Sequence, residues 1–169
     1  MPSTYEPIAT TTLSSTTTTV TFSSIPSTYT DLRLIISGRT DADYGGGISD
    51  GLIRVNSDSG TNYSRTMIRG NGSSATSSRD SNLTYLYELV AGSSAAAGCF
   101  SITTMDFQNY SNTTTNKTVI TRGNLPWYWT TSTVHLWRST SAINRLDLTC
   151  YNNWVSGSTF TLYGIKAFA

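Results

Sequence analysis

The segment Asp31-Leu32-Arg33-Leu34-Ile35-Ile36-Ser37-Gly38 carries the pattern from which the fold can be inferred. Leu32, Leu34 and Ile36 occupy every second position, so an extended chain places all three side chains on one face. Gly38 then starts a stretch of turn-forming residues. The preceding segment 20–23 alternates in the same way, with apolar and hydroxyl side chains taking turns. Both segments therefore predict β-strands with one buried face.

The same alternation recurs along the chain between clusters of Gly, Asn, Ser or Pro. The further predicted strands are residues 52–56, 63–69, 83–90, 99–107, 117–122, 133–138, 143–151 and 159–168. About ten short strands without helical periodicity predict one antiparallel sandwich or barrel, and the long connections at 38–51 and 70–82 favour a jelly roll or Greek key. The predicted fold class is an all-β antiparallel β-sandwich, jelly-roll-like, comprising residues 20–169 behind an extended N-terminal arm.

Composition supports this fold class and argues against several functions. The 169 residues include 30 Thr and 25 Ser but only 2 Lys, 2 Glu and 1 Gln, which disfavours helical surfaces. The net charge of +1 gives no basis for electrostatic capture of nucleic acid or an anionic membrane. We expect no membrane span, because no apolar run approaches the roughly 20 residues that one needs. We expect no signal peptide, because the start lacks a basic and an apolar region. Cys99 and Cys150 are therefore expected to be unpaired, although a cross-strand disulfide is the alternative.

Residues 1–19 form the predicted arm. They are rich in Thr, which favours extended backbone, and their few apolar side chains include Ile8 and Leu13. One interpretation is an edge strand or a frayed terminus. The other, which we favour at this stage, is an arm that docks on a neighbouring molecule, with Tyr5, Ile8 and Leu13 among its contacts.

Catalytic constellations are scarce. His135 is the single histidine, and no Gly-x-Ser-x-Gly motif or neighbouring carboxylate identifies it as a base. Glu6 and Glu88 are the only glutamates, so a glycosidase pair would need Asp106 and Asp147, which nothing in the sequence brings together. We therefore predict a protein that is not an enzyme and needs no cofactor.

One loop offers oxygen ligands for a cation. Asp41, Asp43 and Asp50 flank the glycine run 45–47, and flexible acidic loops suit calcium. The segment lacks the Glu at position twelve of an EF-hand loop, and Asp and Gly are also ordinary turn residues. These three aspartates are therefore weak calcium candidates.

Aromatic residues are the strongest candidates for binding. The run Trp127-Tyr128-Trp129 follows Pro126, and Trp154 follows Tyr151-Asn152-Asn153. Exposed rings of this kind stack on sugars or anchor protein interfaces, whereas buried ones fill the ends of a sandwich. The sequence leaves these alternatives open, and Trp127, Tyr128, Trp129 and Trp154 are candidate partner-binding residues.

Several stretches resemble a group of small structural proteins of tailed bacteriophages. They are Tyr5-Glu6-Pro7-Ile8-Ala9-Thr10-Thr11-Thr12-Leu13-Ser14-Ser15, residues 20–34 from Val20 to Leu34, Leu136-Trp137-Arg138-Ser139-Thr140, and residues 157–165 from Gly157 to Ile165. The resemblance extends over most of the chain but includes no catalytic residue, and the run 127–129 has no counterpart in the family pattern.

This resemblance implies a jelly-roll-like component of the virion. Such modules act as capsid decoration or cement proteins, often as trimers, or as heads of tail fibres and spikes. The expected partners are the major capsid protein and further copies of the chain, with a glycan as the alternative ligand of a fibre head. Nucleic acid and membrane are not expected as partners.

Overall fold

The computed structural model describes residues 4–166, which form twelve β-strands and no helix. The strands are β1 (Tyr5–Thr12), β2 (Thr17–Phe22), β3 (Asp31–Gly38), β4 (Ile48–Val55), β5 (Tyr63–Gly70), β6 (Ala75–Leu83), β7 (Leu86–Ala91), β8 (Ser101–Phe107), β9 (Lys117–Leu125), β10 (Trp129–Trp137), β11 (Leu146–Trp154) and β12 (Thr159–Ile165). Within this part of the chain, no helix could cross a membrane.

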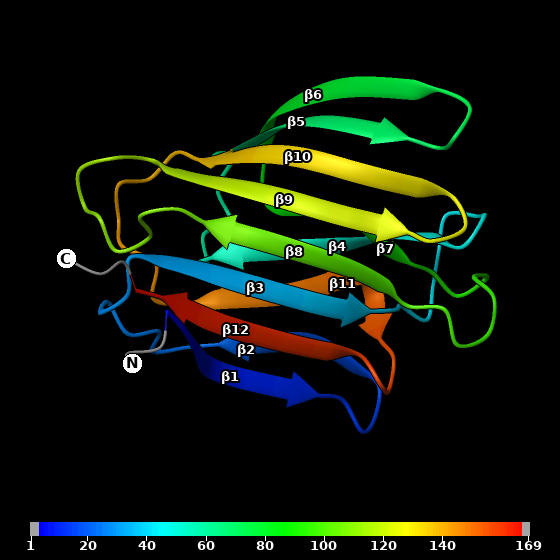
Figure 1. Cartoon of the computed structure of the whole chain (residues 1–169), viewed down its shortest axis with the longest axis horizontal. Helices are drawn as coiled ribbons and strands as arrows, with labels where there is room; N and C mark the ends of the chain where they lie inside the picture. Colours follow the sequence, from blue (N-terminus) through cyan, green and yellow to red (C-terminus); the bar gives the residue numbers. More distant parts are fainter. Residues whose placement is uncertain (1–3, 167–169) are drawn as a thin grey trace.

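The strands form two antiparallel sheets packed face to face (Figure 1). The eight-stranded sheet has the order β1-β12-β3-β8-β9-β10-β5-β6, and the four-stranded sheet has the order β2-β11-β4-β7. The pairs β2–β11, β3–β8, β4–β7 and β5–β6 are nested along the chain and alternate between the sheets, as in a jelly roll. The hairpin β9–β10 is inserted between β8 and β5. The predicted fold class, an antiparallel β-sandwich, is confirmed.

The core lies between the sheets and follows the alternation seen in the sequence. Leu32, Leu34 and Ile36 of β3 are buried, as predicted, and they face Ile53 and Val55 of β4 within one apolar cluster. Burial of such side chains is the main favourable term in folding. Both cysteines are free, with Cys150 buried and Cys99 half-buried.

The predicted boundary between an arm and a sandwich at residues 19 and 20 does not match the strands. β1 pairs with β12 from Tyr5↔Ile165 to Thr12↔Thr159, and β2 starts at Thr17 and pairs with β11. Residues 5–12 are thus an edge strand of their own chain, the alternative interpretation. Their backbone groups bond to β12, and Ile8 and Leu13 pack against the core. Residues 1–3 of the predicted arm, and 167–168 of the last predicted strand, lie outside the described residues.

The predicted loop 70–82 is also partly wrong, because β6 occupies most of it. Nearly every side chain of β6 is exposed, so the strand has no apolar face from which it could be predicted. It is held by its ladder with β5. Leu83 and Leu86, which fall in one predicted strand, belong to two strands on different sheets.

Candidate functional site

The tip of the β9–β10 hairpin carries exposed aromatic rings at one end of the sandwich. The backbone N–H of Tyr128 donates to the carbonyl of Leu125 at 2.8 Å and closes the turn. Trp127 is 37% exposed and Tyr128 is 45% exposed. The indole N–H of Trp127 donates to the carbonyl of Gly46 at 3.1 Å, which fixes the tip to the neighbouring loop. Two predicted partner-binding residues are therefore accessible on a well-anchored turn.

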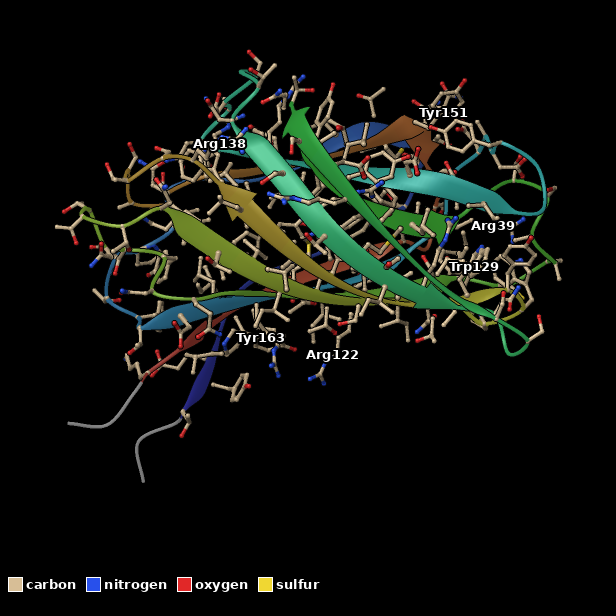
Figure 2. The ribbon with its side chains drawn as sticks, turned by 90° about the horizontal axis from the view of Figure 1, so that it is seen from above. Arg39, Arg122, Trp129, Arg138, Tyr151 and Tyr163 are labelled. Carbon is tan, nitrogen blue, oxygen red and sulfur yellow. The ribbon has the colours of Figure 1, made fainter. Side chains whose placement is uncertain are left out.

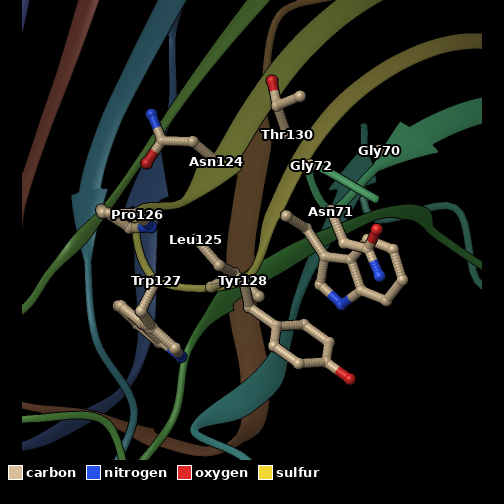
Figure 3. A pocket seen from close by; sticks show the side chains of 10 residues that line it. Gly70, Asn71, Gly72, Asn124, Leu125, Pro126, Trp127, Tyr128 and Thr130 are labelled. Carbon is tan, nitrogen blue, oxygen red and sulfur yellow. The ribbon is translucent and has the colours of Figure 1, made fainter. Parts of the chain in front are cut away.

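Trp129 lies beside this tip and is half-buried. Its ring packs edge-on against Tyr128, with centroids 4.7 Å apart, and the guanidinium of Arg69 lies 4.5 Å from its centroid. A surface hollow of about 360 Å³ separates the tip from the β5–β6 turn, with Asn71 on its far side (Figure 3). We name the hairpin tip, residues 125–129, the aromatic tip.

Trp154 is not available for binding, which corrects its prediction as a partner contact. Its side chain is fully buried in the core and stacks edge-on against Phe160 with centroids 5.1 Å apart. A Cβ on Gly38 would lie 2.8 Å from its ring, so the missing side chain there makes room for the indole. Trp154 has the same parity as the buried Leu146, but the exposed Asn152 and a shift in register after Thr149 interrupt the alternation, so the local pattern did not reveal its burial.

The outer face of the eight-stranded sheet carries aliphatic side chains. The alternation in the sequence had predicted Ser and Thr side chains on this outward face. Val134 of β10 is 50% exposed, and it pairs with Ile120 of β9 on one side and Thr66 of β5 on the other. Ile68 and Ile102 are also more than half exposed on this face. Exposed apolar side chains gathered on one face mark interaction sites. We name this surface, Ile68, Ile102, Ile120 and Val134, the aliphatic face.

A second hollow of about 370 Å³ joins the two surfaces. It is lined by Ile68, Arg69, Arg122 and Ser132, and it shares Gly70 and Thr130 with the hollow at the aromatic tip. The aliphatic face and the aromatic tip are therefore parts of one continuous surface. Figure 2 shows Arg122 projecting from this side of the molecule, while Tyr151 lies on the opposite side.

Tyr44 and Tyr151 form a second exposed aromatic group, which the sequence did not indicate as a pair. Their ring centroids lie 4.6 Å apart, and both side chains are more than half exposed. Beneath them lies the buried carboxyl of Asp50, whose pKa is raised by desolvation and lowered in part by the nearby hydroxyls of Tyr44 and Tyr87. Burial, together with the neighbouring Asp50 carboxyl, raises the pKa of the Tyr44 hydroxyl. Oδ1 of Asp50 has no hydrogen-bond partner within the described residues.

The three calcium candidates do not converge. Asp41 accepts hydrogen bonds from the amides of Asn152 and Asn153, and Asp43 accepts one from the backbone N–H of Ser94 at 2.6 Å. Asp50 lies under the tyrosines. Residues 4–166 hold no group of three or more His, Cys, Asp or Glu side chains able to bind a metal. Asp41 thus holds the loop to β11, and Asp43 holds it to the turn after β7.

His135 and Glu88 form a buried pair that the sequence could not reveal. Nε2 of His135 lies 2.8 Å from Oε1 of Glu88, and both side chains are almost fully enclosed. In this part of the interior, Oε2 of Glu88 and the hydroxyls of Thr103 and Thr131 find no hydrogen-bond partner among the described residues. All three oxygens lie within 3.5 Å of where a Cβ on Gly123 would stand, so they converge on one point.

This pair has no route to a substrate at the surface, because the side chains of His135 and Glu88 are at most 1% exposed. Asp106 and Asp147, the other carboxylates considered for catalysis, bond to Arg33 and Arg145. General acid–base catalysis needs a titratable group within hydrogen-bond reach of substrate. The prediction that the protein is not an enzyme stays a prediction.

The remaining arm candidates lie at the edge strand β1. Tyr5 is 44% exposed, and its ring lies 5.4 Å from the guanidinium of Arg33 and edge-on to Tyr163. Ile8 and Leu13 are half-buried and pack on the core, so they are engaged within their own chain. Of the three, Tyr5 alone presents a large exposed ring to a partner.

No described protein family and no curated protein matches the chain.

Proposed function

We propose that this protein is a non-enzymatic structural component of a tailed-bacteriophage virion, a decoration protein that binds the outer surface of the capsid and stabilises the shell. The proposal rests on the continuous surface formed by the aliphatic face and the aromatic tip. It joins exposed Val134 and Ile120 to exposed Trp127 and Tyr128 without a catalytic group between them. Aromatic and arginine side chains on an apolar surface are typical of protein interfaces. The phage-like stretches of the sequence support the same function.

The framework suits a protein that reinforces a shell. Every strand pairs antiparallel within the described chain, and the aromatic tip is closed by hydrogen bonds at both Trp127 and Tyr128. A surface that is already ordered loses little conformational entropy on binding. Many copies arranged around symmetry axes would convert modest contacts into high avidity. The proposed partners are the major capsid protein and, in a homo-oligomer, further copies of the chain.

A capsid-binding experiment tests this proposal. Purified protein is mixed with capsids that lack it, and bound protein is measured by co-sedimentation. We expect saturable binding that weakens in the Ile120→Thr, Val134→Thr double variant, because both changes keep strand propensity while removing apolar surface. A Thr19→Ser variant on the exposed edge of β2 serves as the control. Failure of the wild-type chain to sediment with capsids would refute the proposed function.

A second candidate function is a glycan-binding head on a tail fibre. The observation in its favour is the grouping of exposed rings at one end, where Trp127 bonds to Gly46 of the loop that also carries Tyr44. Flat exposed rings stack on the apolar faces of sugars. Binding of the wild-type chain to host surface glycans, with loss in Trp127→Ala and Tyr44→Ala but not in Val134→Thr, would favour this candidate over the capsid protein.

A further inference from the structure

Arg122 projects from the aliphatic face without a partner. It is exposed in the middle of β9, and its guanidinium makes no hydrogen bond, ion pair or ring contact within residues 4–166. Arg79 of β6 pairs with Thr66, which in turn pairs with Val134, so it lies on the same face. It is also exposed, and its guanidinium makes no contact of these kinds within residues 4–166. By contrast, Arg33 on the same face bonds to Asp106 through both Nε and Nη2. The face therefore carries uncompensated positive charge.

The surroundings of Arg122 combine aliphatic and polar side chains. It pairs with Ser132 on β10, which pairs with Ile68 on β5, and Ile120 precedes it by two positions on the same face. Val134 and Ile102 lie diagonally across the neighbouring strands. A hollow beside Arg122 extends toward Arg69. The residues directly opposite Arg122, Ser132 and Thr104, are polar, and Asp106 lies diagonally across on β8. A guanidinium beside exposed aliphatic side chains matches the composition of binding hot spots.

The chain has no unengaged carboxylate side chain to offer this surface. Its sequence contains ten Asp and Glu residues, all within the described part; nine accept hydrogen bonds there, and the tenth, Asp50, is buried. The partners of the nine are Lys166 for Glu6, Asn109 for Asp31, Asn152 and Asn153 for Asp41, Ser94 for Asp43, Trp137 for Asp58, Arg65 for Asp80, His135 for Glu88, Arg33 for Asp106 and Arg145 for Asp147. A carboxylate of a second copy would therefore have to be shared with, or released from, a partner in its own chain, whereas a different protein can supply a free one.

We propose that the aliphatic face docks on an acidic surface of a different protein, with Arg122 binding a carboxylate and the aliphatic side chains beside it contacting apolar ones. This inference rests on the proposed function, in which that protein is the capsid protein. Arg is suited to such a site because its planar guanidinium bonds carboxylates through two parallel hydrogen bonds. Nucleic acid fits less well, because phosphate backbones are bound by many Lys and Arg residues and not by an apolar surface.

Charge variants at one position test the inference. In co-sedimentation with capsids that lack the protein, we expect Arg122→Gln to weaken binding about 10-fold and Arg122→Glu about 100-fold, as for a hot-spot arginine. Thr19→Glu, on the exposed edge of the other sheet, changes the net charge by the same amount as Arg122→Gln and should bind like wild type. Arg122 has no partner to lose in the described chain, so its variants should unfold at the wild-type denaturant concentration.

Chemical modification of the capsid identifies the complementary group. Amidation of capsid carboxylates with a carbodiimide and ethanolamine should abolish binding of the wild-type chain, whereas mock-treated capsids should bind it fully. Sedimentation-equilibrium measurements of Arg122→Glu should give the wild-type oligomeric state. Dissociation of an oligomer by Arg122→Glu would assign the face to a second copy and overturn the inference. Binding of DNA to the wild-type chain with loss in Arg122→Glu, and no effect of capsid amidation, would also overturn it.

The two proposals fail in different ways. If the wild-type chain does not sediment with untreated capsids, the decoration function is refuted, and the capsid docking inferred from it fails with it. If the wild-type chain binds but neither Arg122→Glu nor amidation weakens the binding, the function stands and the docking inference alone is refuted.

Discussion

Nε2 of His135 lies 2.8 Å from Oε1 of Glu88 and joins the two sheets of the sandwich through their interior. His135 belongs to β10 of the eight-stranded sheet and Glu88 to β7 of the four-stranded sheet. Both side chains are enclosed, so the bond acts on the stability and mutual position of the sheets. The surfaces proposed for binding lie outside this interior.

Removal of one partner of this pair should destabilise the fold strongly. Glu88→Ala leaves a buried imidazole without its partner, and we expect the free energy of unfolding to fall by roughly 3–5 kcal/mol. A double variant, Glu88→Met with His135→Leu, should recover much of that loss, because apolar side chains can replace a buried polar pair. Urea unfolding measures the free energy of unfolding of both variants. Losses that simply add for the Glu88→Met and His135→Leu single variants would show that the pair is not coupled.

Gly123 should tolerate a side chain only when Thr131 is reduced in size. A Cβ at Gly123 would lie 2.8 Å from Oγ1 of Thr131, a distance that requires displacement. Gly123→Ala should therefore cost roughly 1–3 kcal/mol of stability in the wild-type chain. In a Thr131→Ala background the cost of the same substitution should be less than half as large. An equal cost in both backgrounds would rule out this contact as the cause.

The two tryptophans considered for binding should behave oppositely on truncation. Trp154→Ala removes a fully buried ring and should lower the free energy of unfolding by roughly 3–5 kcal/mol. Trp127→Ala removes an exposed ring with one hydrogen bond and should change it by about 1 kcal/mol or less. Denaturant unfolding followed by circular dichroism compares them. Similar losses for both variants would contradict the buried position of Trp154.

Acid should release the loop that Asp43 holds. Hydrogen bonds, first from Ser94 and then from Gly45, lower the pKa of Asp43 to about 2, below the usual range of an aspartate. Because the folded-state pKa is the lower one, the stabilisation is complete above about pH 4 and disappears as the pH falls toward 2. The amide proton resonance of Ser94 should titrate with a midpoint near pH 2. In Asp43→Asn this titration should be absent; its persistence would assign it to another group.

Much of the fold follows from local sequence pattern, because strands that bury one face repeat every two residues. Leu32, Leu34 and Ile36 could be assigned to the core for this reason. The exposed strand β6 has no such face and depends on pairing with β5, which the local sequence does not encode. The sequence of segment 5–12 did not distinguish an edge strand from the favoured docking arm, because a Thr-rich extended chain suits both.

The candidate site was less predictable, because it depends on contacts between distant segments. Trp127 and Tyr128 could be singled out as aromatic residues, but their exposure follows from the β9–β10 turn and its contact with Gly46. The Tyr44–Tyr151 pair joins a loop to a strand far along the chain, and no local signal connects them. Val134 and Ile120 could have been noticed as β-branched side chains at outward positions of their strands.

The number and position of copies in purified virions test the proposed function most directly. Quantitative mass spectrometry combined with an electron cryo-microscopy reconstruction should give on the order of hundreds of copies per particle on the capsid exterior, as expected for a decoration protein that binds by avidity. The aliphatic face around Arg122 should then lie against the capsid protein. A handful of copies located at the tail, or no copies in the virion, would show that the protein is not a capsid decoration protein.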